Sequence, residues 1–198
     1  MKKLFILIFL LTSIKAFSQE VVYDEIRTLF NGQIRKVSGF FSPYLEFGTV
    51  DKYYARFTGG GACILFNNNF YIGGFGTGKS TSIYSSDSSK LTMGHGGFWI
   101  GGVFKTQKIL HFGASLQMGW GSAKLKDRTD NILPEKFDYD NYNILIPSVE
   151  MEVNLTHWFK VTLGLQQRII FGIHNLSGYK SSDLSKTSIS LGFKLGWF

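Results

Sequence analysis

The chain has 198 residues, 23 glycines, an aromatic content of 16% and a formal net charge of +7. This length fits one domain, and the scattered basic residues form no stripe, so no nucleic-acid partner is expected. The single cysteine, Cys63, excludes an internal disulfide and is interpreted as a small apolar residue.

Residues 1–18 have the pattern of a secretory signal peptide. Two lysines precede the apolar run Leu4–Leu11, and Ala16 and Ser18 fit a cleavage before Gln19. The run is shorter than the roughly 20 apolar residues that a membrane-spanning helix needs. A retained N-terminal anchor is the alternative. Cleavage would remove three lysines and lower the formal charge from +7 to +4.

Residues 19–38 are expected to form a periplasmic segment ahead of the main domain at 39–198. Val22, Ile26 and Phe30 recur at helical spacing, and the Asn-Gly pair that follows Phe30 is a plausible helix stop. This spacing predicts a short amphipathic helix or a strap over Glu20–Phe30. A strand in this segment is the alternative.

From Gly39 onward, a period of two predicts strands separated by turn-like segments. Most of the eight segments are long enough for a tilted membrane strand of about 9–11 residues. The expected strands are Gly39–Gly48, Tyr53–Phe66, Phe70–Gly78, Leu91–Phe104, Ile109–Ala123, Tyr142–Leu155, Lys160–Gly172 and Lys186–Phe198.

Short and long connections alternate between these strands. The short ones are Asn67–Asn69, Lys105–Lys108 and Thr156–Phe159, and the long ones are Lys79–Lys90, Lys124–Asn141 and Ile173–Ser185. Only Thr49–Lys52 departs from the alternation, because it is short where the others are long. The asymmetry is typical of bacterial barrels, whose turns lie in the periplasm and whose loops lie outside.

In several strands an apolar face opposes a polar one. In Lys160–Gly172, for example, Leu163 and Leu165 alternate with Thr162 and Gln166. The polar faces are mostly small or uncharged, which favours a narrow polar lumen with the apolar faces toward lipid. A soluble barrel of the lipocalin type, with the apolar faces inside, is the alternative. The glycine-rich strands leave their faces open.

Six charged residues are expected inside the barrel as a paired network. They are Glu46, Arg56, Glu150, Glu152, Arg168 and Lys194. Equal numbers of acids and bases favour pairing because an unpaired charge in a narrow lumen is costly. Lys194 is expected beside Glu46, and Arg168 beside Glu150 or Glu152. Thr58 is expected to point inward with Arg56.

The last strand is apolar on one face and small or charged on the other, and it ends in Trp-Phe. It resembles the closing strand of bacterial outer-membrane barrels, and its end resembles the signal that the barrel-insertion machinery reads. The residues of this expected assembly signal are Ser190, Gly192, Leu195, Trp197 and Phe198. Phe198 departs from the usual signal by one residue.

Aromatic residues near the strand ends predict two girdles at the membrane interfaces. One set is Phe66, Phe70, Trp158, Phe159, Trp197 and Phe198. The other set is Tyr53, Tyr54, Trp120 and Tyr142. The apolar band between the girdles is expected to be about 25 Å tall.

Two arrangements of residues could serve an enzyme. Gly73–Ser80 matches G-x-x-x-x-G-K-S, but the polar stretch after it is a poor helix, so a chance match is favoured over a phosphate-binding loop. Ser115 and His111 share a strand face that Glu150 or Glu152 could approach, as in lipid-modifying barrels that use Ser, His and an acid. Polar residues filling a lumen are the preferred interpretation. The four histidines show no ligand spacing, so no metal or cofactor is expected.

Two further stretches resemble small, largely uncharacterised bacterial outer-membrane β-barrel proteins. One is Asp24–Phe30 followed by Gly39–Phe41, and the other is Gly59–Ala62 through Asn69–Gly74. The resemblance implies an outer-membrane location and the fold, and it brings no catalytic residues.

The fold expected is therefore all-β: an eight-stranded antiparallel transmembrane β-barrel with a short N-terminal periplasmic extension. The function expected is structural or interaction-based, through extracellular loops and an unknown partner, in contact with outer-membrane lipid. A lipid-acting enzyme, a deacylase or acyltransferase, is the alternative.

Overall fold

The computed structural model describes residues 34–81, 83–84, 90–126 and 138–198. The predicted signal peptide and the predicted helix at Glu20–Phe30 lie outside the described residues. The elements are β1 (Val37–Val50), β2 (Tyr53–Phe66), β3 (Phe70–Lys79), β4 (Ile83–Tyr84), β5 (Lys90–Phe104), β6 (Leu110–Lys126), β7 (Asp138–Asn154), β8 (Phe159–Gln167), β9 (Ile169–Phe171), α2 (Ser181–Leu184) and β10 (Thr187–Gly196).

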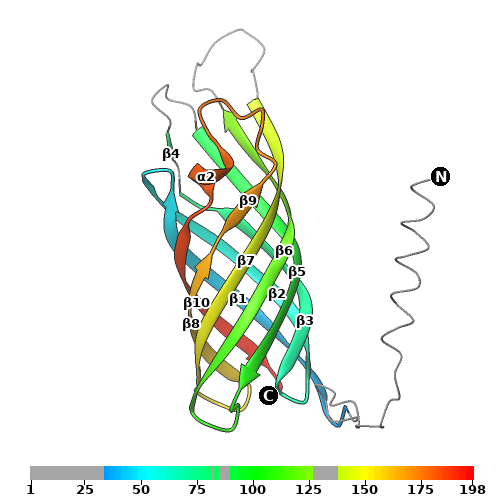
Figure 1. Cartoon of the computed structure of the whole chain (residues 1–198). Coiled ribbons are helices and arrows are strands. Elements are labelled where there is room, and N and C mark those ends of the chain that lie inside the picture. The colour runs from blue at the N-terminus through cyan, green and yellow to red at the C-terminus, as the bar shows by residue number, and fades with distance from the viewer. Residues whose placement is uncertain (1–33, 82, 85–89, 127–137) are drawn as a thin grey trace, which may run out of the picture. The chain divides into compact units, whose positions relative to one another are not determined.

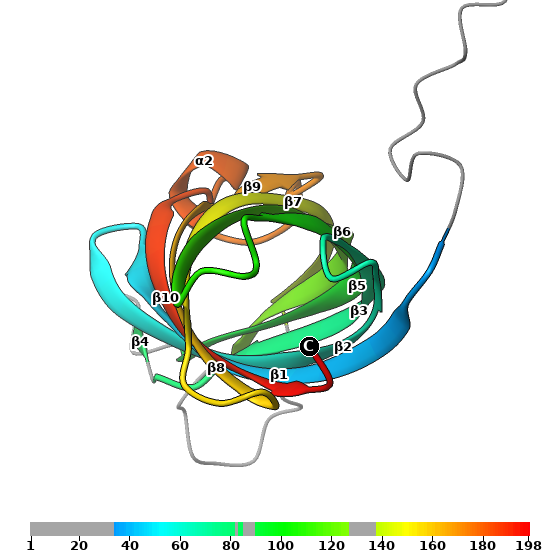
Figure 2. The ribbon, with the colours of Figure 1, turned by 90° about the horizontal axis from the view of Figure 1, so that it is seen from below.

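These strands form a closed antiparallel barrel (Figure 1). The hydrogen-bonded order is β3-β2-β1-β10-β8-β7-β6-β5, and β3 pairs with β5 to complete the ring of eight (Figure 2). The short β9 continues β8 beside β7, and the short β4 extends the wall beside β5. The eight-stranded fold predicted from the sequence is confirmed.

Several strand bounds agree closely with the prediction. β2 has the predicted bounds, whereas β1 begins at Val37, inside the segment assigned to the extension. The predicted strand Lys160–Gly172 is divided at Arg168 into β8 and β9. β4 and α2 lie in predicted loops, and no sequence pattern indicated them.

The two ends of the barrel differ in their connections. At one end, called here the short-turn end, tight turns follow β2, β5 and β7, and β10 ends beside the start of β1. At the other, the long-loop end, the chain makes its long connections after β3, β6 and β9 and the tight turn between β1 and β2. No helix among the described residues is long and apolar enough to cross a bilayer.

The barrel carries apolar side chains on its outer surface and charged side chains inside. Phe112 is 60% exposed, whereas Glu152 on the neighbouring strand is 1% exposed. The exposed apolar residues include Phe41, Ile64, Ile72, Phe98, Phe104, Val149, Leu163, Leu165 and Ile189. This arrangement is the reverse of a soluble lipocalin-type barrel.

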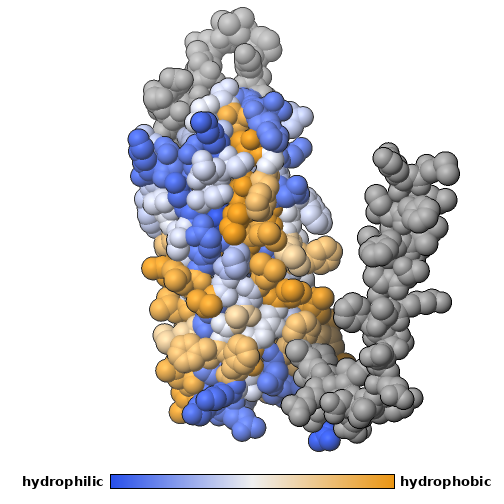
Figure 3. All heavy atoms as spheres, viewed as in Figure 1, coloured by the Kyte–Doolittle hydropathy of each residue, from blue (hydrophilic) through white to orange (hydrophobic). Residues whose placement is uncertain are grey.

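On the face seen in Figure 3, hydrophobic side chains gather in a band over the half of the barrel nearer the short turns. Hydrophilic side chains lie at the rim below the band and toward the long-loop end above it. A belt of apolar side chains between polar rims is the surface of a membrane-embedded barrel.

The aromatic girdles are confirmed in part. The Gly196 N–H donates to the Trp158 carbonyl at 2.9 Å, so Trp158 and Trp197 lie at the same rim, as predicted. Tyr53, Tyr54 and Trp120 are exposed near the opposite end. Tyr142 and Phe198 are exceptions. The Tyr142 side chain points into the barrel and is buried, and Phe198 packs against the core and over the Lys160 ammonium.

Glycines inside the wall make room for aromatic rings in the lumen. A Cβ atom on Gly61 would lie 2.8 Å from the Trp99 ring, and one on Gly121 would lie 2.8 Å from the Tyr142 ring. A Cβ atom on Gly101 would collide with the Tyr71 ring. Large rings inside the barrel therefore pack against glycine backbone of β2, β5 and β6.

The connection from β9 to β10 folds over the long-loop end of the barrel. Ile173, Leu176 and Leu184 of this segment are buried in the apolar core. Asp140 accepts the His174 and Asn175 backbone N–H groups at 2.6 and 2.7 Å. The Asp51 N–H donates to the Asp183 carbonyl, so the segment lies between β9 and the turn after β1, with its apolar side chains in the core.

Candidate functional site: the charged lumen

Five charged or titratable side chains from four strands form a buried cluster near the short-turn end, called here the Lys194 cluster. The Lys194 ammonium donates to Glu150 at 2.9 Å and to Glu152 at 2.5 Å. His111 Nε2 lies 3.0 Å from Glu152 Oε2, and the Lys160 ammonium lies 3.8 Å from the same oxygen. Every member is largely shielded from solvent.

Aromatic rings surround the Lys194 ammonium on its remaining sides. Its Nζ lies 5.3, 5.0 and 5.9 Å from the ring centroids of Phe40, Tyr71 and Trp99. Ring faces attract a cation, and the effect is larger where water is excluded. The carboxylates and the rings together compensate the buried charge of Lys194.

A second charged group, called here the Arg168 cluster, lies nearer the long-loop end. Arg168 Nη1 approaches Glu46 Oε1 at 3.4 Å, and Ser188 donates to the same oxygen at 2.7 Å. Arg168 also donates to the Leu184 and Thr49 carbonyls, both at 3.1 Å. Its guanidinium carbon lies 4.2 Å from the Phe57 ring centroid. The arginine thus ties the loop over the mouth to the barrel wall.

The structure places five of the six predicted network residues inside the barrel, but it exchanges their partners. Lys194 contacts Glu150 and Glu152, and Arg168 contacts Glu46. The strand register explains the exchange: Glu150 and Glu152 lie opposite Gly164 and Thr162 of β8. Arg168 lies further along toward the long-loop end. The predicted pairs of Lys194 with Glu46 and of Arg168 with Glu150 or Glu152 are wrong.

The predicted inward orientation of Arg56 and Thr58 is also wrong. Both side chains are exposed, and Ala55 and Phe57 take the inward positions of β2. Phe57 packs against the Arg168 guanidinium inside the barrel, and the polar side chains of β2 at this level face out. Arg56 instead donates from Nε to the Ser80 hydroxyl at 3.3 Å.

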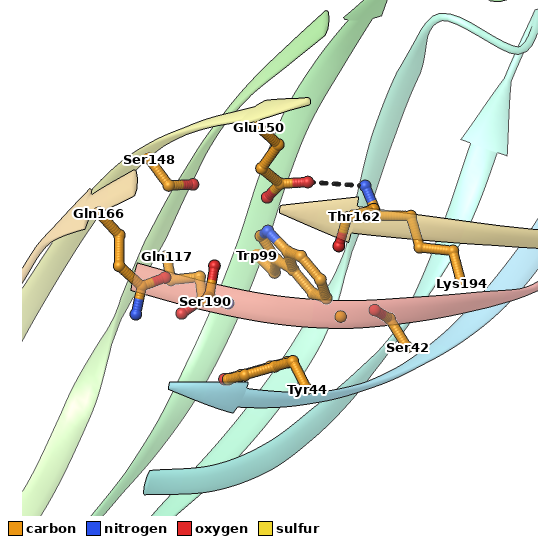
Figure 4. A pocket seen from close by; sticks show the side chains of 11 residues that line it. Ser42, Tyr44, Trp99, Gln117, Ser148, Glu150, Thr162, Gln166, Ser190 and Lys194 are labelled. Carbon is orange, nitrogen blue, oxygen red and sulfur yellow. Dashed lines mark hydrogen bonds and ion pairs between the residues drawn. The ribbon is translucent and has the colours of Figure 1, made fainter. Parts of the chain in front are cut away.

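A small polar cavity of ≈ 20 Å³ lies in the middle of the lumen (Figure 4). Lys194 and Glu150 point toward one another at its edge, and the hydroxyls of Ser42, Ser148 and Ser190 contribute to its lining. This volume corresponds to about one water molecule. Side chains therefore fill the lumen above and below a cavity that could hold one water molecule.

The short-turn end has a larger recess of ≈ 610 Å³, lined by residues that include Asn68, His157 and Lys160. Phe198 forms part of its lining, and the Lys160 ammonium lies 4.0 Å from the Phe198 ring centroid. The last residue of the chain thus covers the charged cluster at the short-turn end, whereas Trp197 points outward and is 79% exposed.

The predicted serine–histidine–acid arrangement does not assemble. Both ring nitrogens of His111 have partners, namely Glu152 and the Lys108 carbonyl at 3.1 Å. Ser115 instead contacts Ser148 at 2.6 Å and Glu150 at 3.2 Å. Four residues along one strand separate Ser115 from His111 by about 13 Å. Among the residues that the structure describes, no histidine contacts Ser115 as a base.

The other weighed motifs also lack a supporting geometry. Gly73 to Lys79 lies within β3, an extended strand, rather than in a loop that leads into a helix. Among the described residues, no group of three or more His, Cys, Asp or Glu side chains is placed to hold a metal ion. Cys63 is buried inside the barrel.

The comparisons with known proteins bear on the fold. No protein-family model matches the chain, and no curated protein matches it. The neisserial surface protein A structure is 12% identical, with a TM-score of 0.55, and the match covers 80% of this chain and 96% of that one.

Two crystal structures of Ail, the attachment invasion locus protein of Yersinia pestis, match similarly. Both are 15% identical over 81% of this chain and 98% of that one, with TM-scores of 0.53 and 0.52. In the first of them Ail is in complex with the heparin analogue sucrose octasulfate. At these identities the likeness concerns the barrel fold.

Proposed function

We propose that the protein is an outer-membrane β-barrel with a side-chain-filled lumen, which acts structurally or through interactions at its long-loop end. The observation that carries this proposal is the distribution of side chains. Exposed apolar residues cover the outside of a closed barrel, and paired charges lie inside it. Such a surface is stable in a bilayer and would aggregate in water.

The packed interior favours an interaction role over a transport role. Two charged clusters, large aromatic side chains and apolar side chains of the β9–β10 connection occupy the interior of the described barrel. Eight-stranded barrels have an interior just wide enough for side chains to fill. The long connections make the long-loop end the part of the barrel that is available to a partner.

The barrel-insertion machinery is a second proposed partner. The outward Trp197 side chain and the alternation of β10 support this proposal. Ser190, Gly192, Leu195, Trp197 and Phe198 remain the residues proposed for the assembly signal.

Cell fractionation combined with heat-modifiable gel migration tests the proposed location and fold together. The protein is expected in the outer-membrane fraction, and the unheated sample is expected to migrate differently from the boiled one. Recovery in the soluble fraction, with one migration position in both samples, would contradict the proposal.

A further inference from the structure

The outer face of β5, β6 and β7 changes character along the barrel axis. Nearest the middle it carries Phe98, Met118 and Leu145, which are direct neighbours across the three strands. Trp120, which is 63% exposed, comes next, and its ring packs edge-on against Phe98. Along the barrel axis, this face thus has apolar side chains suited to contact acyl chains, followed by an aromatic residue suited to the membrane interface.

A groove lined by side chains that end in polar groups follows directly above Trp120. It has a volume of ≈ 430 Å³ and is lined by Ser122, Lys124, Tyr139 and Asn141. Ser122 pairs with Asn141, and Lys124 pairs with Tyr139, so the lining consists of two adjacent cross-strand rows. The groove offers a hydroxyl, an amide and an ammonium at the level where a lipid head group would lie.

Two lysines flank this groove without a compensating acid. Thr92 pairs with Lys124, which makes Lys90 the diagonal neighbour of Lys124, about 7–8 Å away. Both lysines are exposed, and none of the ion pairs among the described residues involves either of them. Like charges held this close repel, and an anion between them would offset the repulsion.

The nearby acids of β7 do not offset this positive charge. Asp138 and Asp140 of β7 are engaged elsewhere, because both accept backbone N–H groups of the loop that follows β9. The described carboxylates nearest in sequence therefore do not neutralise the groove.

We propose that this groove binds one phospholipid whose head group carries a net negative charge, with the phosphate between Lys90 and Lys124. The acyl chains lie along Phe98, Met118 and Leu145, and the Trp120 ring lies at the interface between chains and head group. The proposal rests on the proposed function, because it requires the apolar face below the groove to lie in a bilayer. It adds the site and the chemistry of a lipid that the barrel selects.

The test uses folded protein incubated with phosphatidylglycerol or phosphatidylcholine, and native mass spectrometry to count retained lipids. Wild-type protein is expected to retain phosphatidylglycerol in preference. The double variant Lys90→Gln/Lys124→Gln is expected to lose about fivefold of this preference for each lysine removed. The control Lys52→Gln/Lys180→Gln removes the same charge from exposed positions outside the groove and is expected to behave as wild type.

Three results would overturn the proposal. An unchanged preference in the groove variant would remove the site, and an equal loss in the control would reduce the effect to overall charge. Complete displacement of the lipid by inorganic phosphate would show that the groove binds free phosphate and does not select a lipid.

Heat-modifiable migration in phosphatidylcholine distinguishes failure of the lipid site from failure of the proposed function. Wild-type protein and both variants are expected to fold as barrels there. A barrel without head-group preference would contradict the lipid site and leave the proposed function standing, whereas failure to fold in either lipid would contradict the proposed function.

Discussion

Lys194 organises the half of the lumen nearer the short-turn end. The residue is 2% exposed, and its ammonium contacts two carboxylates and lies among three aromatic rings. A buried ion pair adds little net stability, but removal of one partner leaves the other charge unpaired in a low-dielectric environment. The burial of the charged Glu150 and Glu152 side chains therefore depends on the presence of Lys194.

Replacement of Lys194 by Met is expected to destabilise the barrel by about 3–5 kcal/mol, because Glu150 and Glu152 lose their common cation. Denaturant unfolding in lipid measures the change. Lys194→Met combined with Glu152→Gln should cost less than the two single changes added together. Lys108→Met, an exposed change at the same end, is the control and should be nearly neutral. Additive effects of Lys194→Met and Glu152→Gln would contradict the coupling.

The glycine at position 101 gives a second prediction at this scale. Gly101→Ala is expected to destabilise the barrel by about 1–3 kcal/mol, because its Cβ atom would meet the Tyr71 ring inside the wall. Gly76→Ala is the matched control on a neighbouring strand, since a Cβ atom there meets nothing within 4 Å. Equal unfolding free energies for both variants would show that ring packing against Gly101 does not limit stability.

Individual side chains also show where sequence reasoning succeeds and fails. Alternation assigned Glu150, Glu152 and Lys194 to the lumen, because their strands are polar on one face. It misplaced Arg56 and Tyr142, because the lumen near the long-loop end is lined by apolar and aromatic residues such as Phe57 and Ile144. The rule of polar inside and apolar outside fails toward the long-loop end, because apolar and aromatic residues also line the lumen there.

At the scale of elements, strands were more predictable than their connections. β2 ends at turn residues on both sides, and its bounds were predicted correctly although its glycines left its faces open. The interruption at Arg168 depends on tertiary contacts with Leu184, Thr49 and Glu46, which no local pattern contains. The same applies to α2, a four-residue helix whose Leu184 is buried in the barrel mouth.

The loop between β9 and β10 is anchored by Asp140, which gives a prediction for this element. Asp140→Ala is expected to release two backbone N–H groups and to make residues 172–186 more sensitive to limited proteolysis. The barrel itself should remain folded, because the charged clusters do not involve Asp140. Asn143→Ala, an exposed change on the same strand, is the control. Identical cleavage rates in both variants would contradict an anchoring role.

The end of the chain gives a prediction about assembly. Trp197→Ala is expected to slow insertion in cells while leaving the folded barrel stable, because the side chain is exposed and packs little against the wall. Pulse-chase labelling with heat-modifiable migration measures the rate. Ile189→Ala, an outward change earlier in β10, is the comparison. Equal insertion rates for the two variants would argue against the proposed signal.

For the whole molecule, the packed lumen predicts that the barrel does not conduct ions. The central cavity holds about one water molecule, and both charged clusters are internally paired. Purified protein in a planar bilayer should therefore leave the current at the level of the protein-free membrane. Reproducible unitary current steps would show that the lumen opens.

The pairing of β1 with β10 sets the order in which the chain can fold. Phe40 lies opposite Gly196, so the seam joins the first described strand to the last, and Arg168 meets Glu46 across much of the sequence. Contacts between distant segments carry a large loop-closure entropy and make folding slow. The barrel cannot close before β10 has been synthesised, so the early strands keep unpaired edges and exposed apolar faces until then. A nascent or truncated chain is therefore prone to aggregation and has to be kept unfolded until β10 is complete.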